Sequence, residues 1–170
     1  MTQKVIGFIG NIGSGKSTSA KYLQSILPGS IVISFADELK KTSKEIGWNG
    51  NKDILGRHFL QTFGELCKRD IDNYIWVKKL DIKIKNELTE YDYIIIDDLR
   101  FKIEYDYLKN NYNSIFIKII KNNNFNFLRL FYHISESELL KLKYDIKLIN
   151  NTRNFTDLFD NINSISKYFI

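Results

Sequence analysis

Residues Gly10-Asn11-Ile12-Gly13-Ser14-Gly15-Lys16-Ser17 decide the fold of this chain. They match the pattern G-x-x-x-x-G-K-[S/T] of a phosphate-binding loop. The apolar residues 5–9 predict a buried strand before the loop, and residues 18–27 predict a helix after it, closed by Pro28-Gly29. Glycines between a strand and a helix let backbone N–H groups turn inward and bind anions at the helix N-terminus. The sequence therefore predicts a bound nucleoside triphosphate.

The loop residues have separate expected tasks. Lys16 is expected to reach the β- and γ-phosphates, and the hydroxyl of Ser17 to hold Mg²⁺. The residues expected to bind ATP in and after the loop are Gly10, Asn11, Gly13, Ser14, Gly15, Lys16, Ser17 and Thr18.

Composition limits the class of protein. The chain has 170 residues, of which 44% are hydrophobic and 14% aromatic, as in one globular domain with a sizeable core. No apolar run approaches the roughly 20 residues of a membrane span, and the first strand begins almost at once, so we expect neither a membrane partner nor a signal peptide. The single cysteine, Cys67, excludes an internal disulfide and a cysteine-rich zinc site. We expect a cytoplasmic protein, in the host cytoplasm if the chain is viral.

The charge is basic but dispersed. A net charge of +5 suits either nucleic acid or small substrates rich in phosphate. There is no dense basic run, so we expect no stable nucleic-acid binding. Lysine dominates, and an arginine in such a chain suggests bidentate phosphate binding, which lysine cannot supply. The five arginines are Arg57, Arg69, Arg100, Arg129 and Arg153.

Apolar strands alternate with helices along the rest of the chain. Further strands are predicted at residues 31–35, 93–98, 114–120 and 145–149, and helices at 36–41, 54–71, 74–88, 102–110, 135–143 and 155–169. This order predicts an α/β fold, a three-layer P-loop NTPase with a five-stranded parallel sheet. The nucleotide is expected at the carboxyl edge of the strands.

The strand at residues 93–98 ends in two acids, Asp97 and Asp98. An apolar strand that delivers a carboxylate beside a P-loop is the form of a Walker B element, which orients Mg²⁺. The expected metal-binding residues are Ser17, Asp97 and Asp98. Side chains alternate along a strand, so one of the two acids is expected to face the metal, and the pattern leaves open which.

Several motifs in the middle of the chain carry a resemblance. They are Asp37-Glu38-Leu39-Lys40, Leu60-Gln61-Thr62-Phe63-Gly64 with Arg69-Asp70, Asp98-Leu99-Arg100-Phe101 with Glu104, and His133-Ile134-Ser135-Glu136. Together, and nearly from end to end, they resemble the deoxynucleoside monophosphate kinases of bacteriophages and other viruses. The resemblance implies phosphoryl transfer from ATP to a deoxynucleoside 5′-monophosphate. It also implies a monophosphate-binding helical insertion, placed at residues 37–90, and a lid, placed at 121–135.

Phosphoryl transfer needs cations around the phosphoryl oxygens and an acceptor in line, so basic residues are the first candidates. The predicted catalytic residues are Lys16, Arg69, Arg100 and Arg129, with Arg129 on the lid. The predicted acceptor-binding residues are Asp37, Arg57, Arg69, Trp76, Arg100 and His133. Asn150 and Asn151 are expected near adenine. Structural roles stay open for them: surface ion pairs for arginines, helix charge pairing for Asp37, core packing for Trp76 and a plain turn at the asparagines.

Other functions also stay open. The nearest is another P-loop kinase with a small acceptor, such as a dephospho-coenzyme A kinase or an adenylate- or cytidylate-type kinase. A nucleotide switch needs N-K-x-D, and Asn51-Lys52-Asp53 has Ile54 where the acid belongs. A nucleic-acid-stimulated ATPase is a third alternative. The preferred base, the rejection of ribose and the formation of a homodimer are not indicated by the sequence.

Overall fold

The computed structural model describes residues 4–51, 53–121, 138–151 and 155–169. Its centre is a five-stranded sheet in the order β2-β3-β1-β4-β5, in which every strand pair is parallel. The strands are β1 (Lys4–Ile9), β2 (Ser30–Ile33), β3 (Tyr93–Leu99), β4 (Ser114–Ile120) and β5 (Ile146–Ile149). This confirms the predicted α/β fold with a parallel sheet.

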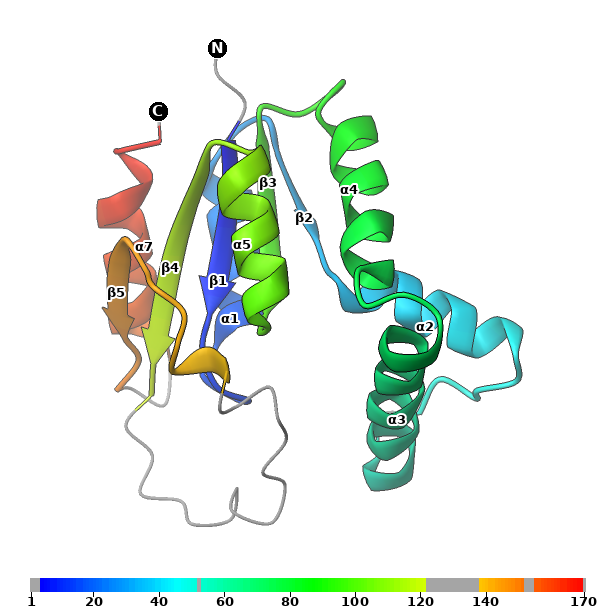
Figure 1. The fold of residues 1–170 in the computed structure, drawn as a ribbon. Helices are drawn as coiled ribbons and strands as arrows, with labels where there is room; N and C mark the ends of the chain where they lie inside the picture. The colour runs from blue at the N-terminus through cyan, green and yellow to red at the C-terminus, as the bar shows by residue number, and fades with distance from the viewer. Residues whose placement is uncertain (1–3, 52, 122–137, 152–154, 170) are drawn as a thin grey trace.

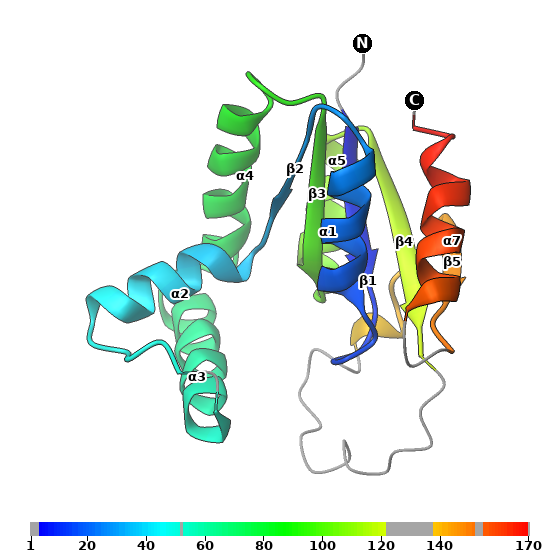
Figure 2. The same cartoon turned by 180° about the vertical axis from the view of Figure 1, so that it is seen from behind.

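Helices cover both faces of the sheet. The described helices are α1 (Lys16–Ile26), α2 (Ala36–Glu45), α3 (Ile54–Asp70), α4 (Ile75–Glu87), α5 (Lys102–Asn111) and α7 (Thr156–Ser166). Figure 1 shows α5 in front of the sheet, with α2, α3 and α4 grouped beyond the β2 edge. The opposite view shows α1 in front of the strands and α7 beside β4 and β5 (Figure 2). The molecule therefore has three layers and a helical group at one edge.

Each face of the sheet has its own core. On one face Ile94 and Phe116 pack with Leu108 of α5 and with Leu80 of α4. On the other face the strands pack against α1 and α7, with Leu23 and Ile162 fully buried. Parallel strands buried on both sides read as continuous apolar runs, which is why the sequence predicted them well. Each such side chain contributes about 1.5–3 kcal/mol on burial.

Small residues, rather than large apolar ones, make the close contacts of α3. Its N-terminus is capped by Asp53, whose side chain accepts a hydrogen bond from the backbone N–H of Gly56 at 2.7 Å. The apolar side chains whose spacing predicted the helix are only partly buried, and Leu66 is 40% exposed. Gly64 is buried and lies against Leu39 of α2 and Trp76 of α4, which lets the three helices approach one another. Cys67 is also buried.

Most of the predicted lid lies outside the described residues. Lys121 is described, but the other residues placed in the lid, including Arg129 and His133, lie outside the described residues. Of the helix predicted at residues 135–143, only residues 138–143 are described. Glu138 and Leu139 are helical and a turn begins at Leu140, so the predicted end at Lys143 is wrong. Among the described helices, none combines the length and the apolar character needed to cross a membrane.

Candidate active site

The P-loop follows β1 at the carboxyl edge of the sheet. Gly13 and Gly15 have φ angles of 74° and 104°, which favour glycine. A Cβ on Gly10 would lie 2.6 Å from the carbonyl oxygen of Ile119, so only glycine fits against β4 there. Helix α1 begins at Lys16, directly after Gly15. The glycines therefore bring the start of a helix, with its N–H groups, to the end of the central strand.

Lys16 lies back across its own loop. Its ammonium donates hydrogen bonds to the carbonyl oxygens of Gly10 at 2.5 Å and Asn11 at 2.9 Å. The residue is only 7% exposed, which is low for a lysine. These bonds hold the charge at the loop, where a triphosphate needs it. Ser17 follows in the first turn of α1 and is exposed.

Asn150 ties the end of β5 to the P-loop. Its side-chain N–H donates to the carbonyl oxygen of Ser14 at 2.9 Å, and its backbone N–H donates to that of Ile120 at 2.8 Å. Asn150 is fully buried, whereas Asn151 is exposed. The side-chain oxygen of Asn150 has no hydrogen-bond partner among the described residues. Asn150 thus fixes the P-loop through its contacts with Ser14 and Gly15.

Asp97 and Asp98 both reach the segment that follows β2. The Ser34 hydroxyl donates to Oδ1 of Asp97, and the two oxygens of Asp98 accept the backbone N–H groups of Phe35 and Ala36, each at 2.9 Å. Simple alternation would point the acids to opposite sides, but the β1–β3 register shifts at this point. A bulge of this kind re-aims side chains.

The two acids therefore differ in what they are free to do. Both oxygens of Asp98 are engaged at the start of α2. Burial and then the charge of Asp97 raise the pKa of Asp98, against the pull of its two hydrogen bonds. Asp97 keeps one oxygen outside its bond to Ser34. Of the two carboxylates, Asp97 is the one that fits a metal ion.

Ser17 offers a hydroxyl and Asp97 a carboxylate oxygen, and oxygen ligands are the kind that Mg²⁺ prefers. No group of three or more His, Cys, Asp or Glu side chains that could hold a metal occurs in the part of the chain that the structure describes. Magnesium keeps waters and shares substrate phosphates rather than filling an all-protein cage, so this sparse set suits it.

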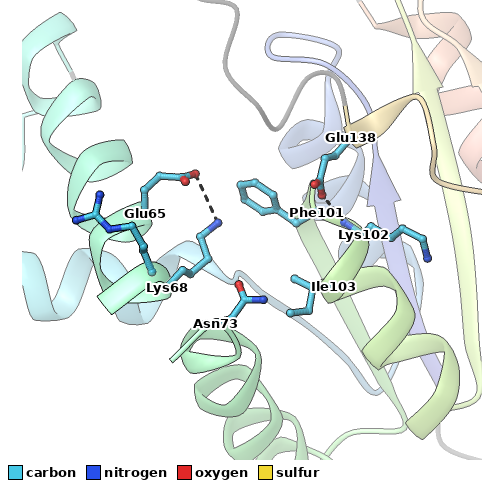
Figure 3. Close-up of a pocket in the computed structure, with 8 residues that line it drawn as sticks. Glu65, Lys68, Asn73, Phe101, Lys102, Ile103 and Glu138 are labelled. Carbon is cyan, nitrogen blue, oxygen red and sulfur yellow. Dashed lines mark hydrogen bonds and ion pairs between the residues drawn. The ribbon is translucent and has the colours of Figure 1, made fainter. Parts of the chain in front are cut away.

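A cavity of about 480 Å³ separates α3 from the start of α5 (Figure 3). Its size is in the range of small-molecule sites. Figure 3 shows Glu65, Lys68 and Asn73 on the insertion side, facing Phe101 and Ile103 on the α5 side. The complete lining is Glu65, Lys68, Arg69, Asn73, Phe101, Lys102, Ile103 and Glu138.

Two of the three predicted acceptor arginines, Arg69 and Arg100, lie at or near this cavity. Arg69 lines it and makes a two-pronged contact with Asp70, at 2.6 and 2.7 Å. Its side chain is 72% exposed, so it is free to move toward a ligand if it leaves Asp70. Arg100 lies one residue before Phe101 and its backbone N–H donates to Glu104 at 3.0 Å. The structure therefore brings Arg69 to the cavity and Arg100 to the turn beside it.

Glu104 fixes that turn. Its Oε2 accepts the backbone N–H groups of Arg100 and Phe101, both at 3.0 Å. Burial raises the pKa of Glu104 to about 8, with Asp98 adding to the rise and the two hydrogen bonds and Lys68 opposing it. In the sequence Glu104 stood out only as part of a motif. The signal for its role is its position three residues after Phe101, where a glutamate caps a helix start.

The other predicted acceptor residues lie elsewhere. Asp37 accepts the backbone N–H of Ser34 at 3.1 Å and pairs with Lys83 at 3.0 Å and Lys40 at 3.6 Å. Burial raises the pKa of Asp37, but Lys83 and the other partners outweigh this, so the net pKa is lowered. Trp76 is buried and its indole N–H donates to the carbonyl oxygen of Gly64 at 3.2 Å.

Arg57 is an exposed residue of the first turns of α3. Neither Arg57 nor Trp76 is among the described residues that line the cavity. Reasoning from sequence missed Lys68 and Asn73, which do line it. Nothing in their spacing separates them from surface residues, because the cavity forms only when α3 and α5 are placed side by side.

A second hollow of about 400 Å³ lies beside the start of α1, lined by Ser17, Thr18, Lys21, Tyr22 and Phe159. The rings of Tyr22 and Phe159 stack at a centroid distance of 4.1 Å. The hollow therefore joins the first turn of α1 to helix α7.

Comparison with known proteins shows the family of this chain. A profile described as deoxynucleotide monophosphate kinase matches residues 30–162, which is more than half of the chain. The chain belongs to the deoxynucleotide monophosphate kinase family. The matched range begins after the P-loop and contains the acids, the cavity residues and the arginines of the candidate site. The chain is therefore an enzyme that transfers a phosphoryl group to nucleoside monophosphates.

One relative supports this family assignment, and two solved structures share the fold. A protein of Acanthamoeba polyphaga mimivirus named "Putative deoxynucleotide monophosphate kinase" is 33% identical, covering 86% of this chain and 88% of its own. TT1252 from Thermus thermophilus has a TM-score of 0.58 at 16% identity, covering both chains fully. A thymidylate kinase from Candida albicans has a TM-score of 0.52 at 14% identity, with 99% of this chain and 92% of that chain covered. The two structures show a shared fold.

Proposed function

We propose that this member of the family transfers the γ-phosphoryl group of ATP, with Mg²⁺, to the 5′-phosphate of a deoxynucleoside monophosphate. One observation carries the detail. The P-loop follows β1, and Arg100 and Phe101 follow β3. These two strands are direct neighbours, with Ile9 opposite Leu99. The loop for the triphosphate and the segment that lines the cavity at Phe101 therefore begin side by side at the same edge of the sheet.

The chemistry needs little from the protein besides position and charge. Lys16, held at the loop by Gly10 and Asn11, supplies a fixed cation for the β- and γ-phosphates. Backbone N–H groups at the start of α1 hold the remaining phosphate oxygens. Mg²⁺ bound by Ser17 and Asp97 would neutralise charge that develops on the phosphates.

The acceptor belongs in the cavity between α3 and α5. We assign its phosphate to Arg69 and Arg100, since guanidinium groups bind phosphate oxygens in pairs. The segment 37–90, which carries α2, α3 and α4, is then the acceptor-binding insertion. Asp37 and Arg57 stay as secondary acceptor contacts, and Trp76 supports the insertion through Gly64.

The remaining assignments come from the sequence. The lid at residues 121–135, with Arg129 and His133, would exclude water so that ATP is not hydrolysed. Asn150 and Asn151 are assigned to the surroundings of adenine, and of the two only Asn151 has an exposed side chain. A free nucleotide as acceptor requires no nucleic-acid partner, and the nucleotide substrates suit the cytoplasm.

The test is product identification. Purified protein is incubated with ATP, Mg²⁺ and one acceptor at a time, and the products are separated by ion-exchange chromatography. We expect equimolar ADP and a deoxynucleoside diphosphate. Phosphorylation of dephospho-coenzyme A alone, with no deoxynucleoside diphosphate from any acceptor, would replace this function with the nearest alternative.

A further inference from the structure

Lys68 is the most enclosed cation of the acceptor cavity. Its side chain is only 17% exposed, whereas that of Arg69, the next residue, is 72% exposed. Figure 3 shows the ammonium of Lys68 directed into the space between α3 and Phe101. The two neighbours on α3 thus present one cation to the cavity interior and one to its outer edge.

Among the described residues, two weak contacts hold the ammonium of Lys68 in place. It lies 3.5 Å from the centroid of the Phe101 ring, close enough for a cation–π attraction. It also forms an ion pair with Glu65 one turn earlier, at 3.6 Å, which is longer than a hydrogen bond. An ammonium carries three strong donors and is well hydrated in water. The ring face and the 3.6 Å ion pair do not provide the short hydrogen bonds that these three donors can form.

The surroundings of Lys68 favour an anion. Its charge acts on Glu104, whose carboxylate holds the backbone N–H groups of Arg100 and Phe101. Lys68 on α3 and the Arg100 turn before α5 therefore approach the cavity from opposite walls. The charged residues that line the cavity are Glu65, Lys68, Arg69, Lys102 and Glu138. Three are cations and two are anions.

We propose that Lys68 binds the phosphate of the acceptor nucleotide, and that Phe101 holds its ammonium in the cavity before the acceptor enters. This inference rests on the proposed function and adds a binding residue to it. A phosphate dianion offers short charge-assisted hydrogen bonds that the Phe101 ring and Glu65 do not. An ammonium only donates, so among the parts of a nucleotide it recognises the phosphate oxygens most strongly.

The deciding variant is Lys68→Met, which keeps an unbranched apolar stem against Phe101 and removes the charge. Binding of a deoxynucleoside monophosphate and of the matching deoxynucleoside is measured by competition against a fluorescent monophosphate analogue. We expect the monophosphate to bind about 10-fold more weakly or worse, as for the loss of one charged hydrogen bond. The deoxynucleoside, which lacks the phosphate, should change by less than about two-fold.

Two further variants and a control complete the test. Lys68→Arg should restore part of the monophosphate affinity. Phe101→Leu keeps the apolar volume without the ring face, and should weaken monophosphate binding by about 2–5-fold, the range of an exposed cation–π contact. Lys109→Met is the control, since Lys109 lies over Tyr105 at 5.7 Å, at the far end of α5. It should leave both affinities unchanged.

The outcomes separate this inference from the proposed function. Equal losses for monophosphate and deoxynucleoside in Lys68→Met, or no loss in either, would overturn the role of Lys68. In either case, wild-type protein that still forms deoxynucleoside diphosphates leaves the proposed function intact. Wild-type protein without such turnover contradicts the proposed function, while the binding comparison still decides whether Lys68 reads the phosphate.

Discussion

The ammonium of Lys16 lies 2.5 Å from the carbonyl oxygen of Gly10, the first residue of its own loop. Together with the bond to Asn11, this contact holds a positive charge at the P-loop, beside the backbone N–H groups at the N-terminus of α1. The loop is thus built for a triphosphate from two sources of positive potential, one fixed by the backbone and one by a side chain.

Lys16→Ala should lower kcat by about 100-fold or more, because removing one preorganised charge from a phosphoryl-transfer site has effects of this size. The measurement is steady-state ADP release in a coupled assay. Lys16 belongs to neither hydrophobic core, so we expect the variant to fold. An unchanged circular dichroism spectrum would confirm this. Near-normal turnover would contradict the role assigned to the loop.

Asp97→Asn and Asp98→Asn should have different effects. Asp98 accepts backbone N–H groups on both oxygens. Replacing one oxygen by an amide N–H leaves a donor facing a donor, so Asp98→Asn should lower the free energy of unfolding by about 1–3 kcal/mol. Asp97→Asn should mainly raise the Mg²⁺ concentration needed for activity. Urea unfolding and Mg²⁺ titration of the rate separate the two, and the reverse pattern would exchange their roles.

Glu104 should make stability depend on pH. Its pKa is raised to about 8 in the folded protein, above the ordinary value of 4.5. A carboxyl group with a raised pKa contributes stability that is fully present below its unfolded pKa and is lost as pH rises through the folded value. Between pH 5 and 8 the wild type should therefore lose stability relative to Glu104→Gln, whose carbonyl oxygen still accepts both N–H groups. The measurement is the free energy of urea unfolding of both proteins at several pH values. A difference between wild type and Glu104→Gln that stays constant from pH 5 to 8 would rule out the raised pKa.

Arg69→Lys should raise KM for the monophosphate by about 10-fold, because lysine cannot make the paired hydrogen bonds of a guanidinium. KM for ATP should stay within about two-fold, since Arg69 lines the acceptor cavity and not the P-loop. If neither constant changes, Arg69 serves only its ion pair with Asp70.

Asn150→Asp should weaken ATP binding. The substitution removes the N–H that donates to Ser14 and puts a carboxylate oxygen against a carbonyl oxygen in a fully buried position. We expect a higher KM for ATP and a lower melting temperature. Asn151→Asp, at the exposed neighbouring position, is the matched control and should change neither by much.

The fold could be predicted from the sequence because its signals are local. The glycine spacing of the P-loop and the mainly apolar runs of β1, β3 and β4 are each short stretches of sequence. The family resemblance is confirmed by the comparisons. The strand bulge at Asp97 and Asp98 was not predicted, because it depends on the register between β1 and β3.

The acceptor cavity shows the same limit. Arg69 was chosen from the sequence for its residue type, but the enclosure of Lys68 depends on how α3 lies against Phe101. Likewise the burial of Trp76 follows from the close approach of α4 at Gly64. Contacts between segments more than thirty residues apart, such as Lys68 with Phe101, carry no local pattern that a single sequence displays.

The most direct measurement is the initial rate of ADP release from ATP and Mg²⁺ in the presence of each deoxy- and ribonucleoside monophosphate in turn. We expect ADP release to require a monophosphate, and the highest rate to be reached with a deoxynucleoside monophosphate rather than a ribonucleoside monophosphate. ADP release that is equally fast without any monophosphate, or that depends on added DNA, would contradict this expectation.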